Sequence, residues 1–294
     1  MCWFGARWRV CVSKQGVGWC VAEFAKPMPL FGVFMACVTS SERMGAMKLI
    51  WFAALCGIFS TAAQAFDTSM AERTRACTYC HGEQGKAGPD GYYPRLAGKP
   101  AGYLFNQLQN FQQGRRQYDL MARLIEPLPD AYLRDMAQYF SSLKVPYPAP
   151  ALSTASVPAA LLARGRALTL EGDAARGVPA CVSCHGAQLT GVMPNVPGLL
   201  GLPLDYLNGQ LGAWQSGQRR AHAPDCMAQV VKRLNADDLM AVAQYLARQP
   251  LPADTSPVSL SVLRASWTER PASAQLVTQA SWTCGSAPLQ GAQP

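Results

Sequence analysis

Apolar side chains recur at helical spacing in both halves of the chain. In the segments 103–111, 131–143 and 161–170 they follow the spacing expected for one face of a helix. The positions that define these faces are Tyr103, Leu104, Leu108, Phe111, Leu133, Met136, Ala137, Phe140, Leu161, Leu162, Leu168 and Leu170. Few stretches alternate between apolar and polar positions as strands do, so the pattern predicts an all-α fold.

The chain also contains an internal repeat. Residues 77–82 (Cys-Thr-Tyr-Cys-His-Gly) are matched by residues 181–186 (Cys-Val-Ser-Cys-His-Gly), 104 positions later. Further matches downstream keep nearly the same offset, and small loop insertions explain the drift. The clearest pairs are Pro94/Pro197, Leu96/Leu199, Gly98/Gly201, Tyr103/Tyr206, Leu104/Leu207, Gln107/Gln210, Met121/Met227 and Tyr139/Tyr245. The repeat therefore predicts that each half forms one domain and that the two domains have the same fold.

A proline-rich stretch marks the boundary between the two halves. A chain of 294 residues has room for two domains. The prolines within 146–154 cannot continue a helix and favour an extended connector. We therefore expect a first domain over 66–145, a linker over 146–156, a second domain over 157–249 and a tail of unclear role over 250–294.

The residues before the first domain have the features of an export signal. Lys48 precedes an apolar run over 49–59, and the small residues at 63–65 form a cleavage site before Phe66. The run is too short to span a bilayer. Residues 47–65 thus predict a signal peptide, and the mature protein is expected to be soluble and periplasmic. Residues 1–46 are expected to be an over-called start, with a genuine extension or a membrane-associated leader as the alternative.

The charge balance argues against one class of partner. The formal net charge is +8, and 49% of the residues are apolar against 15% charged, as in a globular protein. Residues 1–65 hold six basic and two acidic residues, which leaves +4 for the remainder of the chain. The sequence has no run of basic residues of the kind typical of nucleic-acid binding, so no nucleic-acid partner is expected.

Each repeat carries a Cys-x-x-Cys-His motif, which has the chemistry of c-type haem attachment. Two thiols at this spacing form thioethers to the porphyrin vinyl groups, and the adjoining histidine reaches the iron. A redox dithiol or a zinc site is the alternative, but neither explains the paired histidines and the matched downstream sequence. Two covalently bound haem c groups are predicted, on Cys77, Cys80, Cys181 and Cys184, with His81 and His185 as iron ligands.

The second axial ligand has to come from each half separately. Met121 and Met227 follow their histidines by 40 and 42 residues, and each precedes a leucine by seven positions, so the repeat favours them. His222 is the alternative in the second half, but the first half has no histidine at this point, and an exposed loop position is expected for it. Methionine at helical spacing is commonly core filler, which is the expectation for Met136 and Met240.

The iron-binding histidines also need their other ring nitrogen held. Pro94 and Pro197 follow the histidines by 13 and 12 residues, in a repeated Pro-x-Leu-x-Gly context. We expect each proline carbonyl to accept the Nδ1 hydrogen of its histidine, which would fix the orientation of the ring and its basicity as a ligand. A plain loop proline is the alternative.

Several segments resemble the two-haem cytochrome c4 family. They are 93–98 (Tyr-Pro-x-Leu-Ala-Gly), 165–168 (Gly-Arg-Ala-Leu), 171–173 (Glu-Gly-Asp), 176–181 (Arg-Gly-Val-Pro-Ala-Cys) and 184–187 (Cys-His-Gly-Ala). The resemblance covers roughly residues 68–249. It implies two tandem class I cytochrome c domains related by a pseudo-twofold axis, haem propionates near their interface, and electron transfer towards a terminal acceptor.

The tail departs from that family. A disulfide between Cys226 and Cys284 would tie it to the second domain, and unpaired buried thiols are the alternative. On the chain-entropy model such a bridge stabilises by about 4 kcal/mol at most. Trp267 and Trp282 are expected either to anchor a partner protein or to pack on the second domain.

Electron transfer is the predicted function. With both axial positions filled, neither iron offers a vacant site, so one-electron exchange is the chemistry left. We expect a carrier rather than an enzyme, moving electrons from a quinol-oxidising complex or a dehydrogenase to a terminal oxidase or reductase, soluble but able to dock at membrane respiratory complexes. Two alternatives stay open: the cytochrome subunit of a periplasmic dehydrogenase, and a dihaem peroxidase, which would need one half without a usable methionine.

Overall fold

The computed structural model describes residues 9–13, 16–20, 69–88, 91–147, 156–268 and 282–287. The chain divides into two compact units, Met1–Ala65 and Phe66–Pro294. In the first unit, β1 (Arg9–Ser13) pairs antiparallel with β2 (Gly16–Cys20). The predicted signal peptide over 47–65, most of the predicted extension over 1–46, and residues 148–155 of the predicted linker lie outside the described residues. No helix in the described ranges is long and apolar enough to cross a membrane.

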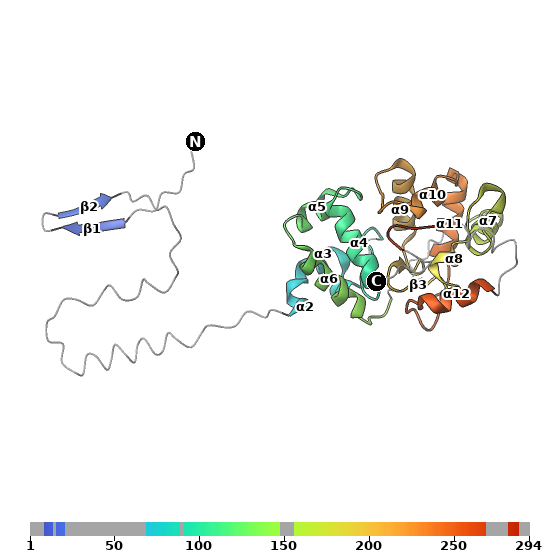
Figure 1. Ribbon diagram of the computed structural model, residues 1–294, viewed down its shortest axis with the longest axis horizontal. Helices are drawn as coiled ribbons and strands as arrows, with labels where there is room; N and C mark the ends of the chain where they lie inside the picture. Colours follow the sequence, from blue (N-terminus) through green and yellow to red (C-terminus); the bar gives the residue numbers. More distant parts are fainter. Residues whose placement is uncertain are drawn as a thin grey trace. The chain divides into compact units, whose positions relative to one another are not determined.

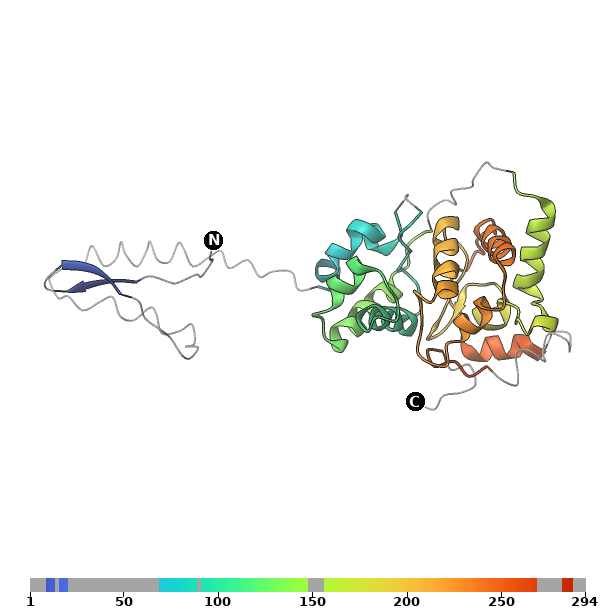
Figure 2. The same ribbon diagram turned by 90° about the horizontal axis from the view of Figure 1, so that it is seen from above.

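The second unit contains both repeats, each built as a set of helices (Figures 1 and 2). The first half consists of α2 (Met70–Arg73), α3 (Arg75–His81), the 3₁₀ helix η1 (Glu83–Gly85), α4 (Ala101–Gln112), α5 (Asp119–Ile125) and α6 (Asp130–Ser142). The second half consists of α7 (Ala159–Leu170), the 3₁₀ helix η2 (Ala174–Arg176), α8 (Val182–His185), the short hairpin β3 (Gly191–Val192) and β4 (Val196–Pro197), α9 (Leu204–Ser216), α10 (Cys226–Val231) and α11 (Ala236–Ala247). A last helix, α12 (Leu260–Thr268), belongs to the tail. The predicted all-α class is confirmed.

The helices predicted from hydrophobic spacing are confirmed as α4, α6 and α7. Helix α4 packs on α5 and α6, and α11 packs on α7 and α9. Met136 lies in the core of the first half as expected. The expectation for Met240 is wrong: its side chain is 45% exposed, because α11 turns the opposite face, with Leu239, Val242 and Ala243, towards the core.

The two halves meet through residues that are equivalent in the repeat. Arg116 and Arg219, 103 positions apart, form an antiparallel bridge. The Gln117 N–H donates to the Gln218 carbonyl at 3.0 Å, and the Arg220 N–H donates to the Arg115 carbonyl at 2.7 Å. Each half thus contributes the same short segment, which is the local signature of the expected pseudo-twofold relation.

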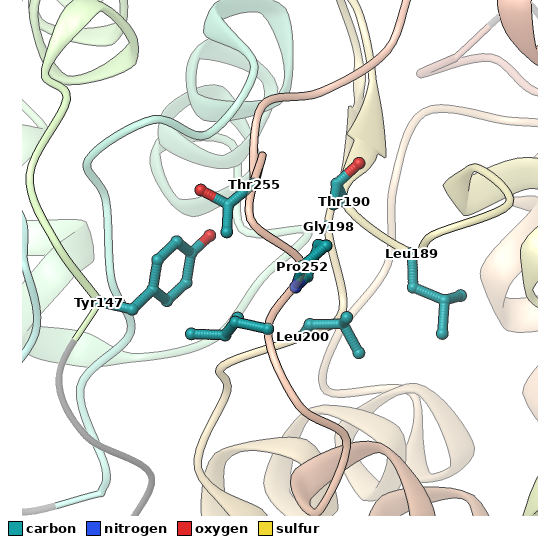
Figure 3. A pocket seen from close by; sticks show the side chains of 8 residues that line it. Tyr147, Leu189, Thr190, Gly198, Leu200, Pro252 and Thr255 are labelled. Atoms are coloured by element: carbon teal, nitrogen blue, oxygen red, sulfur yellow. The ribbon is translucent and has the colours of Figure 1, made fainter.

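The start of the linker is held by both halves. Arg95 donates to the carbonyls of Val145 and Pro146. Its guanidinium lies 4.0 Å from the centre of the Tyr147 ring. That ring lies against Gly201 of the second half, where a Cβ would approach the ring to 2.5 Å. Figure 3 shows the pocket at this junction, which has no room for a water molecule and is therefore a packing contact. Its lining consists of Tyr147, Leu189, Thr190, Gly198, Leu200, Leu251, Pro252 and Thr255.

A buried carboxylate ties α11 to the start of the second half. Asp238 accepts hydrogen bonds from Arg164 at 2.8 Å and from Arg176 at 2.7 Å. Both arginines also donate to Asp173. In addition, Asp238 completes the capping box at the first turn of α11 by accepting the Asn235 backbone N–H.

Replacing Asp238 with asparagine is expected to destabilise the second half by about 3 kcal/mol, because two arginines lose a nearly buried counter-charge. Burial acts to raise the pKa of Asp238, but hydrogen bonds from Arg176 and Arg164 outweigh it and leave the pKa below its ordinary value. The stabilisation is therefore present above about pH 4 and is lost as the pH falls further. Denaturant unfolding at pH 7 and pH 3 measures both effects. Asp237→Asn, at the exposed neighbour, is the control, and equal losses in the two variants would contradict the prediction.

Candidate haem sites

Helix α3 presents the first Cys-x-x-Cys-His motif and ends at His81. Cys77 and His81 are four positions apart, so they lie on one face of the helix. Gly82 then turns the chain with a φ of 74°. A Cβ at this position would lie 2.4 Å from the carbonyl oxygen of Ala87, so the turn behind the histidine requires glycine.

Helix α8 presents the second motif in the same way and ends at His185. Gly186 follows with a φ of 88°. Both histidines are buried, each 7% exposed. The two repeats therefore place their histidines in equivalent surroundings, at the end of a helix and inside the protein.

Each proline carbonyl lies within hydrogen-bonding distance of its histidine, at the position expected from the repeat. The His81 Nδ1 is 2.8 Å from the Pro94 carbonyl oxygen, and the His185 Nδ1 is 2.7 Å from the Pro197 carbonyl oxygen. A histidine that donates its Nδ1 hydrogen to a carbonyl leaves the lone pair of Nε2 for a metal. Burial lowers the pKa of His185, which favours the neutral ring that binds iron.

Within the described residues, none of the four motif cysteines takes part in a disulfide: Cys77, Cys80, Cys181 and Cys184. Burial raises the pKa of Cys77, and it raises the pKa of Cys181 to about 11. The described residues contain no group of three or more His, Cys, Asp or Glu side chains that could hold a metal ion. A pair of thiols beside an oriented imidazole, with no further ligand of this kind nearby in the described residues, fits covalent haem attachment better than a zinc site.

The two candidate methionines occupy equivalent helices. Met121 lies on α5 and Met227 on α10, each in the helix that follows the long helix of its half. Met121 is half-buried at the edge of a core cluster with Phe111 and Met136, and Met227 packs against the core of the second half.

In the first half, tyrosines link the histidine to the methionine helix. The Tyr93 ring centre lies 6.2 Å from that of His81, and its hydroxyl lies 3.4 Å from the hydroxyl of Tyr118, the N-cap residue of α5. Tyr92 packs against both tyrosines. The second half has no tyrosine at the matching positions 195, 196 and 221, so this cluster is specific to the first half.

His222 is not the exposed loop residue that was expected. It is half-buried, and its Nε2 accepts a hydrogen bond of 2.9 Å from Arg115 of the first half. Its backbone N–H donates to the Ser286 hydroxyl of the tail. The approach of the tail and of the first half to this loop buries the ring, and neither contact is visible in the sequence.

Cys226 and Cys284 form a disulfide with an S–S distance of 1.98 Å. It joins the first residue of α10, next to Met227, to the tail segment 282–287. The two tail tryptophans pack on the second half: the Trp267 indole N–H donates to the Ser183 carbonyl at 2.8 Å, and the Arg233 guanidinium lies over the Trp282 ring.

A pair of arginines at the interface between the halves was missed at the sequence level. Arg116 and Arg219 each donate to both Gln107 and Gln210, at 2.7–3.0 Å, and to a tyrosine hydroxyl of the opposite half, at 3.2 and 3.4 Å. The network consists of Tyr103, Gln107, Arg116, Tyr206, Gln210 and Arg219. Among the described residues, no carboxylate pairs with either guanidinium. The repeat register could have identified the pair, because it places both arginines at the same position.

Lys99 is a second contact that the sequence does not reveal. It belongs to the first half, is buried, and donates to the Gly198 carbonyl of the second half at 3.0 Å. Gly198 follows Pro197, whose carbonyl holds His185. Burial and the nearby Arg95 lower the pKa of Lys99 to about 8. The repeat places Leu202 at this position in the second half, so the second half has no lysine that could make the equivalent contact.

Comparisons with known proteins identify the family. No family model matches the chain. The thiosulfate dehydrogenase electron acceptor of Thiomonas intermedia is 37% identical over 206 residues, which span 70% of this chain and 93% of the relative.

Two solved structures match the fold. Reduced recombinant cytochrome c4 from Pseudomonas stutzeri aligns with a TM-score of 0.50 and 30% identity, over 60% of this chain and 95% of that one. Thiosulfate dehydrogenase from Marichromatium purpuratum aligns with a TM-score of 0.53 and 34% identity, over 63% of this chain and 40% of that longer one. The chain therefore belongs to the cytochrome c4 family: it is an electron-transfer cytochrome, not itself an enzyme, with two covalently attached haem c groups and redox proteins as partners.

Proposed function

We propose that this chain is the periplasmic electron acceptor of a dehydrogenase that oxidises thiosulfate. The observation that carries the proposal is its similarity to the Thiomonas acceptor over nearly the whole length of that relative. The similarity to a solved thiosulfate dehydrogenase supports the same partner. These similarities favour a cytochrome that serves a periplasmic dehydrogenase, which the sequence leaves open as an alternative, over a general respiratory carrier.

The chain's own residues have three tasks in this function. Cys77 and Cys80 would hold one haem and Cys181 and Cys184 the other, while His81, Met121, His185 and Met227 would bind the two irons. The carbonyls of Pro94 and Pro197 hold the two imidazoles in one orientation. Haem c supplies reversible one-electron chemistry at its iron. Side chains held in one orientation would keep the surroundings of the iron similar in its two oxidation states, which favours fast electron transfer.

The contacts between the halves support transfer of electrons within the chain. Arg116 and Arg219 bind the same two glutamines, so the interface has one defined register. Lys99 and Tyr147 add two further links between the halves. A fixed register would keep the distance between the two redox sites constant.

The cysteines are consistent with an oxidising compartment. The disulfide between Cys226 and Cys284 is of the kind that persists outside the cytosol. The predicted signal peptide over 47–65 would deliver the chain to the periplasm. Delivery of the electrons to a terminal oxidase or reductase stays a prediction.

The test is a reduction assay with the holoprotein. The oxidised protein is mixed with the thiosulfate dehydrogenase of Thiomonas intermedia and thiosulfate, and reduction is followed by visible absorption. We expect complete reduction, with two electrons per chain, only when enzyme and thiosulfate are both present. The Thiomonas acceptor is the positive control. If that acceptor is reduced and this protein is not, thiosulfate dehydrogenase is not its donor.

A further inference from the structure

The two haem-attachment motifs differ in how far the protein covers them. In the first motif Tyr79, between the two cysteines, is 86% exposed, and Cys80 is exposed as well. In the second motif the equivalent Ser183 is 0% exposed, and Cys184 is half-buried. The same motif is therefore open to solvent in one half and closed in the other.

The cover over the second motif is the C-terminal segment. Helix α12 lies beside α8 and β3 (Figure 1). Leu263 of α12 is almost fully buried in a cluster with Val192 and Val196, against which Cys184 also packs. The Trp267 hydrogen bond to the Ser183 carbonyl fixes α12 directly on the attachment helix.

Two anchors hold this segment in place. Before α12, Val258 exchanges backbone hydrogen bonds with the hairpin strand β3: its N–H donates to Gly191 at 3.0 Å, and its carbonyl accepts from Met193 at 2.8 Å. After α12, Cys284 is bonded to Cys226 beside Met227, and the Ser286 carbonyl accepts a hydrogen bond from Asn106 of the first half. The segment therefore contacts both the histidine-bearing and the methionine-bearing helix of the second half.

We propose that α12 and the segment 282–287 shield the second haem from other proteins, so that partners exchange electrons with this chain at the Tyr79–Cys80 edge of the first half. The inference rests on the haem attachment given under Proposed function. A helix with its side chains is about 10 Å across, and electron transfer slows steeply as the separation grows. Electron transfer to a partner docked over α12 would be slowed by that added distance, whereas electron transfer to a partner docked at Tyr79 would not. An electron from the reduced donor would enter at the first haem and could pass within the chain to the second haem; it would leave through the first haem to the oxidised acceptor.

A charge placed at each surface tests the route without an identified partner. The probe is hexaammineruthenium(II), a cationic one-electron reductant, mixed with the oxidised holoprotein in a stopped-flow instrument at low salt. Tyr79→Asp is expected to raise the second-order rate of reduction by about twofold to fivefold, because a carboxylate attracts the cation to that edge. Val262→Asp, on the outer face of α12, is the matched control and is expected to leave the rate unchanged. Both positions are well exposed, at 86% and 55%, so both variants should fold. An equal or larger effect at Val262 overturns the proposal.

A second readout does not depend on electron transfer. In hydrogen–deuterium exchange of the oxidised holoprotein, the amides of 182–186 are expected to exchange more slowly than those of 78–82. Trp267→Ala should accelerate exchange at 182–186 alone, since it removes the contact with Ser183. Equal protection of the two motifs would contradict the shield.

Neither experiment involves thiosulfate, so the shield can fail while the proposed donor stands. Loss of only one haem from a Cys77→Ala/Cys80→Ala variant, seen by mass spectrometry, checks the attachment on which the inference rests.

Discussion

Replacing Met121 with histidine is expected to lower the reduction potential of one haem and to leave the other close to its original value. Methionine favours the reduced iron and thereby raises the potential, whereas a second imidazole favours the oxidised iron. The change should be a sizeable fraction of the roughly 0.8 V that axial ligands span. Met227→His should do the same to the other haem. A potentiometric titration followed by visible absorption resolves the two steps.

Two control variants separate ligation from general disturbance. Met240→His places the same substitution at an exposed position of α11 and should leave both potentials unchanged. His222→Gln removes the alternative ligand of the second half, and it should also leave both potentials close to their original values, because that ring is bonded to Arg115. If His222→Gln shifts one potential and Met227→His does not, His222 is the ligand and the assignment of Met227 is wrong.

Features with a local cause could be predicted from the sequence. The helices α4, α6 and α7 follow from the spacing of their apolar residues, and the two Cys-x-x-Cys-His motifs follow from the spacing that thioether formation requires. The placement of Pro94 and Pro197 against the histidines was also within reach, because the repeat carries both prolines in the same context.

Features that depend on how helices and halves pack against one another could not be predicted in this way. Lys99 meets Gly198 across the interface, and no local pattern marks a lysine for burial. His222 looks like a loop residue until the tail and the first half close over it. Met240 fits the helical period, but α11 is packed on one face only, so the period alone does not decide which methionine is buried. In each case the deciding partner lies far away in the sequence.

Gly165→Ala is expected to destabilise the second half by about 3 kcal/mol, at the upper end of the usual cost of overpacking. Gly165 lies where α7 crosses α11. A Cβ there would stand 2.1 Å from the Ala241 carbonyl oxygen and 2.7 Å from the Tyr245 Cβ. Ala241 is fully buried, so the helix backbone has nowhere to move without opening the core. The steric clash outweighs the gain of up to about 1 kcal/mol that alanine brings over glycine in a helix.

The same substitution elsewhere in the second half isolates the helix crossing as the cause. Gly212 lies inside α9, and a Cβ there would meet nothing within 4 Å. Gly212→Ala should therefore gain the helix propensity without the clash, and stabilise by up to about 1 kcal/mol. Denaturant unfolding of the two holoproteins, followed at the haem absorption and by circular dichroism, measures the difference. The opposite signs are the decisive feature: if both variants are stabilised, α7 and α11 do not cross as closely as the structure places them.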